Sequence, residues 1–193
     1  FELCLAGAQA WRRFAPRVQT HTRRTLDYGD DGAMACAVTS EQVAALEVLH
    51  AGCRNRGTLC ETLSGSQARR LEPSLSDGVV GALLLPTDQQ VDNWAVIEGV
   101  LALLSDAGAR LHAGAPVTCL DHETTGVRVN RDAVFDYVVW TAGEGARHKV
   151  KINGRAESLL PLNALTPVKG QMLAVAPHAG GPRRVLRFGA GYV

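Results

Sequence analysis

Apolar positions follow a helical period in some parts of the chain and a strand period in others. Residues 1–15 have near-helical spacing, which predicts an amphipathic helix that ends at Pro16. Thr39 or Ser40 can cap a second helix, which Gly57 closes. The apolar stripe that this second helix is expected to bury consists of Val43, Leu46, Val48 and Leu49.

A strong helix is predicted over residues 93–107. Asp92 stands in its N-cap position and Gly108 in its C-cap position, so Asp92 is interpreted as a helix cap rather than a cofactor ligand. A shorter helix is predicted over residues 64–71, because the residue before Pro73 avoids helical geometry. The helical period of the 93–107 segment turns these residues inward: Trp94, Ile97, Val100, Leu101 and Leu104.

Apolar runs of strand length occupy much of the remaining chain. The segment from Val134 to Trp140 is β-branched or aromatic at every position except Asp136, and the small residues 141–143 follow it. Such a strand end is either a plain turn or a place where a large flat ligand lies against the backbone. Residues 151–163 are expected to be irregular. The other predicted strands are 25–28, 33–38, 58–63, 78–85, 110–112, 117–120, 126–129, 165–175 and 185–193.

The order of these elements predicts a mixed α/β fold class. Helix, strand, hairpin and strand follow one another over residues 92–150, which is the pattern of the second half of a dinucleotide-binding sheet. Residues 1–91 and 151–193 are strand-rich and are expected to form a separate antiparallel sheet. Because the chain begins in a helical pattern and ends in a strand pattern, we expect an internal piece of a longer polypeptide.

Composition excludes several classes of protein. Apolar residues make up 46% of the 193 residues, which is enough for a real core. The net charge of +1 and the absence of a long basic block disfavour nucleic acid as a partner, and no stretch reaches the ~20 apolar residues of a membrane span. The five cysteines form no C-x-x-C pair and the six histidines are scattered. This usage predicts no metal site and a reducing, cytoplasmic location.

The motifs are informative as an ordered set. The pyrophosphate-binding pattern G-x-G-x-x-G follows no predicted strand, and Gly189-Ala190-Gly191 is interpreted as a turn or bulge. The chain contains, in this order, LEPSL (71–75), DQQVD (88–92), GAPV (114–117), FDYVVWTAG (135–143) and PVKGQ (167–171). This order and spacing resemble the FAD-dependent enzymes of the D-amino-acid oxidase superfamily, and within it the glycine oxidases.

The resemblance implies FAD as the cofactor, bound by part of a Rossmann-like domain beside an antiparallel substrate domain. It implies that Thr141, Ala142 and Gly143 pass beside the flavin, where a larger side chain would collide with it. It also implies that the main-chain N–H and C=O of Val117 pair with the adenine edge, and that the Tyr192 phenol faces the substrate. A tight turn, a core valine and an ordinary strand tyrosine remain the plain alternatives.

The activity implied by the resemblance is oxidative deamination of a small amino acid or amine, with glycine as the first candidate. The imine would hydrolyse to an oxo acid and ammonia, with hydrogen peroxide as the other product. A sarcosine or other N-methyl amine oxidase, or a D-amino-acid dehydrogenase, is the alternative within this class. The alternative of another class is a non-catalytic α/β binding module. We expect the 193-residue chain alone to be inactive, to hold FAD poorly and to self-associate, and a homo-oligomer is compatible with this.

Overall fold

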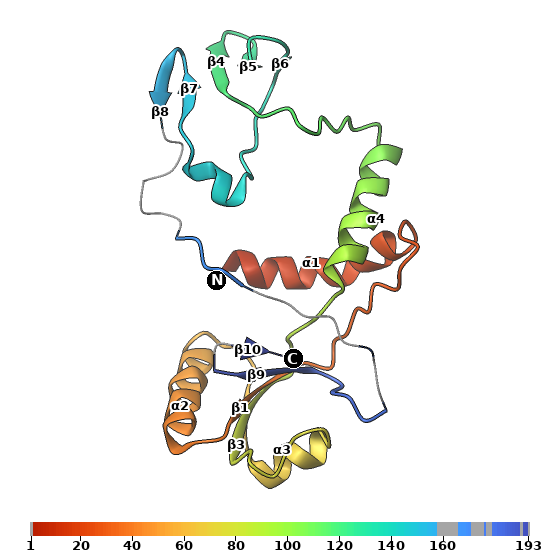
Figure 1. The fold of residues 1–193 in the computed structure, drawn as a ribbon, viewed down its shortest axis with the longest axis vertical. Coiled ribbons are helices and arrows are strands. Elements are labelled where there is room, and N and C mark those ends of the chain that lie inside the picture. The colour runs from red at the N-terminus through yellow and green to blue at the C-terminus, as the bar shows by residue number, and fades with distance from the viewer. Residues whose placement is uncertain (1, 158–165, 171–175, 177–178, 190, 193) are drawn as a thin grey trace. The chain divides into compact units, whose positions relative to one another are not determined.

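The computed structural model describes residues 2–157, 166–170, 176, 179–189 and 191–192. The chain forms two compact units, unit 1 (Phe1–Arg110 with Ala176–Val193) and unit 2 (Leu111–Val175). Both contain a mixed sheet (Figure 1), which confirms the predicted mixed α/β class. The assignment of residues 92–150 to a cofactor domain and of the flanking segments to a substrate domain stays a prediction.

The sheet of unit 1 has the strand order β10-β9-β1-β3-β2. β1 pairs with β9 in parallel, and the other neighbours are antiparallel. The prediction of a purely antiparallel sheet is therefore wrong at this one pairing, because β9 returns from the far end of the chain. The strands are β1 (Ala33–Ala37), β2 (Glu61–Ser64), β3 (Gly81–Leu85), β9 (Val185–Phe188) and β10 (Gly191–Tyr192).

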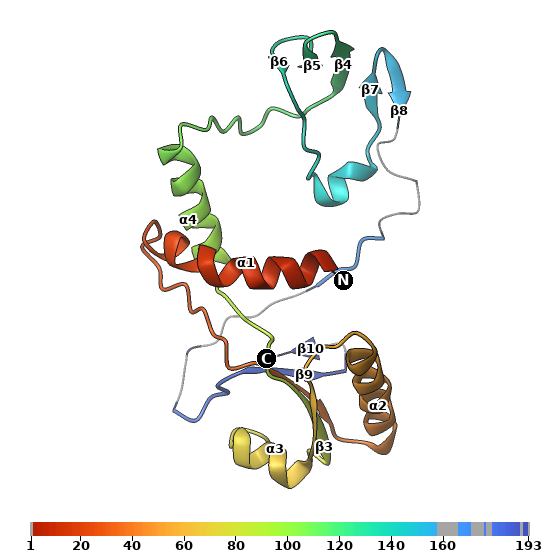
Figure 2. The same ribbon diagram turned by 180° about the vertical axis from the view of Figure 1, so that it is seen from behind.

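Alternate residues of β1 pack on opposite faces of this sheet, as strand geometry requires. Met34 and Cys36 join the apolar cluster that includes Ala68 of α3 (Gly65–Leu71), whereas Ala35 joins the cluster that includes Leu46 of α2 (Ser40–Asn55). The two helices therefore cover opposite faces, which Figure 2 shows from behind.

The caps of α2 confirm the predicted boundaries of this helix. The Thr39 side chain accepts a hydrogen bond from the Gln42 N–H at the start of α2, and Gly57 follows its end with a positive φ of 66°. The predicted buried stripe of α2 is wrong in its second half, since Val48 is 75% exposed and Leu49 is 41% exposed. The predicted strand 25–28 is also wrong, because only the isolated bridge between Gly29 and Gln90 forms there.

A second core of unit 1 lies between α1 (Glu2–Gln19) and α4 (Asn93–Asp106). Ala15 and Val18 of α1 are buried against Ala95 of α4. The prediction that Pro16 ends the first helix is wrong, since the helix continues to Gln19. The missing N–H of a proline costs a helix one hydrogen bond, and burial of Ala15 and Val18 offsets that cost.

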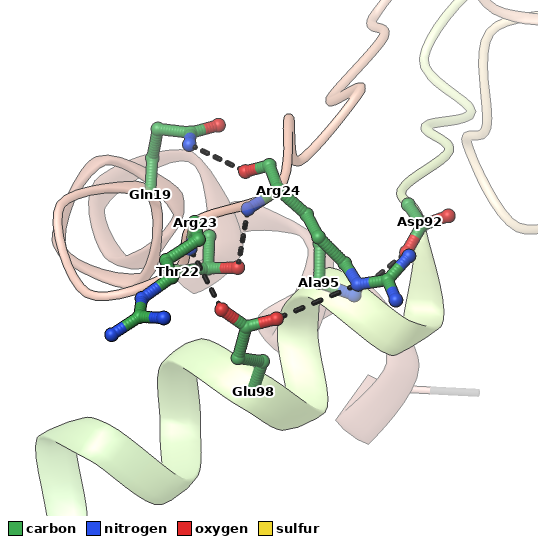
Figure 3. Close-up of polar contacts among 7 residues, drawn as sticks. All are labelled: Gln19, Thr22, Arg23, Arg24, Asp92, Ala95 and Glu98. Carbon is green, nitrogen blue, oxygen red and sulfur yellow. Dashed lines mark hydrogen bonds and ion pairs between the residues drawn. The ribbon is translucent and has the colours of Figure 1, made fainter.

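Polar contacts attach the turn after α1 to the first turns of α4 (Figure 3). The Glu98 carboxylate accepts a hydrogen bond of 2.8 Å from the Arg23 N–H and forms an ion pair of 3.5 Å with Arg24. The Asp92 side chain accepts a hydrogen bond of 2.6 Å from the Ala95 N–H, which confirms its interpretation as the N-cap of α4. The predicted start of this helix is therefore correct.

The side of α4 that packs against α1 differs from the predicted one. Ala95 and Gly99 are the buried residues of α4, and Val100 is half-buried beside them. These small residues let the backbones of α1 and α4 approach closely. The large apolar residues of α4 lie on its opposite side. The exposed members of the predicted inward set are Trp94 (66%), Ile97 (51%), Leu101 (44%) and Leu104 (46%).

The close approach of the two helices leaves no space for a side chain at Gly99. A Cβ at Gly99 would stand 2.6 Å from the Val18 carbonyl oxygen. We expect Gly99→Ala to lower the free energy of unfolding by about 1–3 kcal/mol, the range for overpacking, although alanine is the better helix former.

Gly7 of α1 is the matched control, because a Cβ added there would meet nothing within 4 Å. Gly7→Ala should raise the free energy of unfolding by about 0.5–1 kcal/mol. Urea denaturation of both variants checks this, and equal effects would contradict it.

The sheet of unit 2 has the strand order β6-β5-β4-β7-β8, with β4 and β7 in parallel (Figure 1). An Asn153-Gly154 turn with positive φ joins β7 to β8, so the prediction of an irregular segment over 151–163 is wrong for residues 151–157. Residues 158–163 lie outside the described residues. Its strands are β4 (Cys119–Glu123), β5 (Gly126–Val129), β6 (Val134–Phe135), β7 (Val150–Ile152) and β8 (Arg155–Glu157).

Three other predicted strands differ from the structure. Residues 110–112 form no strand, and the described residues 166–170 form none either, while 165 and 171–175 lie outside the described residues. The predicted single strand 185–193 is a hairpin of β9 and β10. Gly189, with a φ of 57°, lies in a turn, which confirms the interpretation of Gly189-Ala190-Gly191 as a turn or bulge at its first residue. Ala190 lies outside the described residues.

Candidate functional site

The small residues 141–143 lie after the end of β6 and outside any strand. β6 covers only Val134 and Phe135, so the prediction of a strand reaching Trp140 is wrong within this unit. β5 is the only described neighbour of this strand, and residues beyond Phe135 have no ladder partner among the described residues. The 3-10 helix η1 (Gly143–Arg147) follows.

The local geometry of 141–143 leaves room for a ligand. Thr141, Ala142 and Gly143 are all exposed, and a Cβ at Gly143 would meet nothing within 4 Å. Gly143 has a φ of 55°, a left-handed conformation that glycine adopts without strain. The space beside the backbone on which the flavin expectation rests is therefore present. A plain turn has the same geometry, so the flavin contact stays a prediction.

Val117 lies just before β4 with its main chain unpaired. Neither its N–H nor its C=O has a hydrogen-bond partner among the described residues. Both neighbours of Val117, in contrast, are held by the side chain of Asn130. The Asn130 amide nitrogen donates to the Pro116 carbonyl at 2.9 Å, and its oxygen accepts from the Thr118 N–H at 2.8 Å.

Sequence reasoning missed Asn130. The available signal was its place in the short Asn130-Arg131-Asp132 segment between two strand patterns, where asparagine favours left-handed turns. The structure gives Asn130 a φ of 50° and a main-chain hydrogen bond of 2.9 Å from its N–H to the Cys119 carbonyl. No local pattern could have shown that its side chain reaches back to the segment before β4.

Tyr192 belongs to the other unit. It lies in β10 and pairs with Arg187 of β9 in the sheet of unit 1. Val117 and residues 141–143 belong to unit 2. The structure therefore groups the two predicted cofactor contacts in one unit and the predicted substrate contact in the other, and the role of Tyr192 stays a prediction.

Unit 2 also contains a small hollow of about 190 Å³ that is lined by Leu120, His122, Val127, Val138, Trp140 and Ile152. The indole N–H of Trp140 is buried and has no hydrogen-bond partner among the described residues. Sites for drug-sized ligands usually measure about 300–1,000 Å³, so this hollow is too small for a flavin. We assign it no cofactor role.

The titratable groups of the described residues include one His–carboxylate pair, His21 and Asp106 at 3.3 Å, and a buried thiol. Burial, and secondly the Glu72 carboxylate, raises the pKa of the Cys36 thiol to about 11, so Cys36 is a poor nucleophile at neutral pH.

No cluster of His, Cys, Asp and Glu among the described residues could hold a metal ion. None of the described helices is both long enough and apolar enough to cross a membrane.

A mixed α/β chain with unpaired main-chain groups before one strand and a small-residue segment after another fits the class of proteins that bind a dinucleotide cofactor. The model of the DAO family, described as FAD dependent oxidoreductase, matches residues 1–193. The chain belongs to this family, and FAD is the family's cofactor.

Solved structures with a similar fold include two glycine oxidases. The enzyme from Bacillus cereus is 21% identical, with a TM-score of 0.59 over 69% of this chain and 38% of its own. The enzyme from Geobacillus kaustophilus is 22% identical, with a TM-score of 0.59 over 67% of this chain and 35% of its own. An L-proline dehydrogenase from P. horikoshii is 17% identical, with a TM-score of 0.50 over 64% and 33%.

The chain therefore spans 38% or less of the length of these three neighbours. Among curated proteins, no sequence matches it significantly.

The described residues fit FAD at two places. Val117 offers one free donor and one free acceptor, which is what the edge of an adenine ring requires. Residues 141–143 offer an exposed backbone with no side chain larger than that of threonine. No pyrophosphate-binding glycine pattern lies in the sequence.

Proposed function

We propose that the full-length protein is an FAD-dependent oxidase of a small amino acid, with glycine as the first substrate to test. The observation that carries this proposal is the family match over residues 1–193. The motifs LEPSL, DQQVD, GAPV and PVKGQ favour the glycine-oxidase branch of the family. FAD, when bound, would supply the redox chemistry, which is two-electron oxidation of the substrate at its α-carbon with oxygen reduced to hydrogen peroxide.

The chain's own residues would bind and orient the reactants. The Val117 main chain would hold the adenine edge, and residues 141–143 would allow the flavin to lie against the backbone. The Tyr192 phenol would donate a hydrogen bond to the substrate carboxylate. The imine that leaves the site would take up water and release ammonia, which yields the oxo acid. No acid–base pair is needed among these residues, because the cofactor supplies the redox chemistry.

Two finer assignments belong to this proposal. One is a cytoplasmic location, supported by cysteines that are all free in the structure. The other is a supply of dehydroglycine for thiazole formation in thiamine biosynthesis, which rests on the resemblance to glycine oxidases alone.

The test is peroxide release by the full-length protein with glycine, sarcosine and D-alanine, each with added FAD. We expect the highest kcat/KM with glycine. A preference for sarcosine would identify an N-methyl amine oxidase instead. Reduction of an artificial electron acceptor without peroxide would identify a dehydrogenase. No turnover of any amine would contradict the proposal.

A non-catalytic binding module is the second candidate, and the apolar stripe of α4 favours it. Trp94, Ile97, Leu101 and Leu104 lie at helical spacing on one side of α4, and each is between 44% and 66% exposed. Exposed apolar surface of this kind is typical of protein–protein contacts. This candidate gains support only if the full-length protein neither turns over an amine nor binds FAD.

A further inference from the structure

We propose that Asn130 is a positioning residue for the adenine end of FAD. Its side chain holds the residues before and after Val117, and so leaves the Val117 main chain free and fixed in place for the adenine edge. This inference rests on the proposed function, in which Val117 contacts the adenine. It assigns a role to a residue that contacts no part of the cofactor itself.

The contacts of Asn130 surround Val117 on both sides. The amide nitrogen donates to Pro116 O at 2.9 Å, and the amide oxygen accepts from Thr118 N at 2.8 Å and from the Thr118 hydroxyl at 3.2 Å. The Thr118 carbonyl is held as well, since it accepts a hydrogen bond of 3.0 Å from the Lys151 N–H of β7. Pro116 and Thr118 are thus both held in place, while Val117 between them is unpaired among the described residues.

The chemistry of this arrangement needs an amide in a left-handed turn. A side chain with one donor and one acceptor is required to bridge a carbonyl and an N–H that flank one residue. Asparagine provides both and tolerates the φ of 50° observed at position 130. A segment pre-organised in this way binds a ligand without first losing conformational freedom, so its loss weakens binding.

Asn153 provides a matched control in the same sheet. It has a φ of 49°, its N–H donates to the Leu120 carbonyl at 3.0 Å, and its side-chain oxygen accepts from the His122 N–H at 2.8 Å. Asn153 therefore supports β4 in a similar way, but at residues beyond Val117. A general weakening of β4 should follow from either substitution, whereas loss of adenine positioning should follow only from that of Asn130.

The experiment compares N130G and N153G in the full-length protein, since glycine keeps the positive φ and removes only the side chain. The measurements are the dissociation constants of FAD and of ADP, which carries the adenine half of FAD. We expect N130G to raise both constants about tenfold, the effect of about 1.4 kcal/mol, and N153G to change them less than about twofold. Equal effects of the two variants, or no effect of N130G, would overturn the proposal.

Two further measurements separate this inference from the proposed site. Val117→Pro removes the donor at position 117, and its melting temperature reports whether the fold survives. If a folded V117P variant binds FAD normally, the assignment of Val117 fails, and the role of Asn130 fails with it. If V117P weakens binding and N130G does not, only the positioning role fails. Hydrogen exchange of the Thr118 amide should be faster in N130G than in the unsubstituted full-length protein. Unchanged exchange would also contradict the positioning role of Asn130.

Discussion

Replacing Glu72 with alanine is expected to lower the free energy of unfolding by about 3 kcal/mol. Removal of one partner from a buried ion pair typically costs about 3–5 kcal/mol, because the other charge is left uncompensated. Glu72 is fully buried and contacts Arg184, whose side chain is 14% exposed, at 3.5 Å. We expect the lower end of the range, because the Arg184 Nε makes no hydrogen bond in the described part of the chain.

The large effect has a second cause in the other contacts of Glu72. Its carboxylate accepts hydrogen bonds from the Ser74 hydroxyl at 2.8 Å and from the Arg183 N–H at 3.2 Å. These contacts attach the segment before β9 to the end of α3, so the loss of Glu72 also loosens the parallel pairing of β9 with β1. Glu72→Gln keeps an acceptor for both hydrogen bonds and should cost less than Glu72→Ala.

The chain provides a surface ion pair of equal length as the control. Arg69 and Asp77 also lie 3.5 Å apart, but the Asp77 side chain is fully exposed. Asp77→Asn should change the free energy of unfolding by less than about 0.5 kcal/mol, because water screens exposed pairs. Urea denaturation followed by circular dichroism measures all three variants. Similar effects for Glu72→Ala and Asp77→Asn would show that burial of the pair is unimportant.

Replacing Gly143 with a bulkier residue is expected to abolish FAD binding by the full-length protein while its fold survives. Our proposal places the flavin against the backbone of residues 141–143, where a branched side chain would occupy its place. Gly143→Val adds backbone strain of about 1–2 kcal/mol at a φ of 55° in addition to its bulk. Gly143→Asn separates the two effects, since asparagine tolerates this conformation.

The flavin content of the purified variants measures this effect, and the melting temperature without FAD measures the strain. Both variants should lose flavin, and only Gly143→Val should show a clear loss of stability. Gly145→Ala is the matched control in the same 3-10 helix, because its added Cβ would stand 3.7 Å from the Ala142 Cβ, an ordinary contact. Normal flavin content in Gly143→Asn would remove the assignment of residues 141–143.

Signals carried by neighbouring residues predicted the starts of three helices of unit 1 well. Thr39, Ser64 and Asp92 are each predicted starts of a helix, and each accepts a hydrogen bond from an N–H three residues later. Such caps depend only on residues within one turn, so the sequence contains all the information that is needed.

Predictions that depended on distant partners were less successful. The helical period shows that α4 has a large apolar side, but Gly99 and Ala95 decide which side meets α1. The segment after Phe135 has strand composition, yet a strand forms only where another strand pairs with it. The same limit applies to the site, where Asn130 is joined to Pro116 by the fold and not by any local pattern.

The parallel pairing of β1 with β9 affects how the chain folds during its synthesis. Residues 33–36 leave the ribosome before unit 2, and their partners 185–188 emerge only after all of unit 2 has been made. Until then, one edge of β1 is open to other polypeptides, and a chaperone that binds extended apolar segments would protect it. The hairpins of unit 2 need no such wait, so they should form before β9 pairs with β1, and completion of the unit 1 sheet should be the slow step of folding.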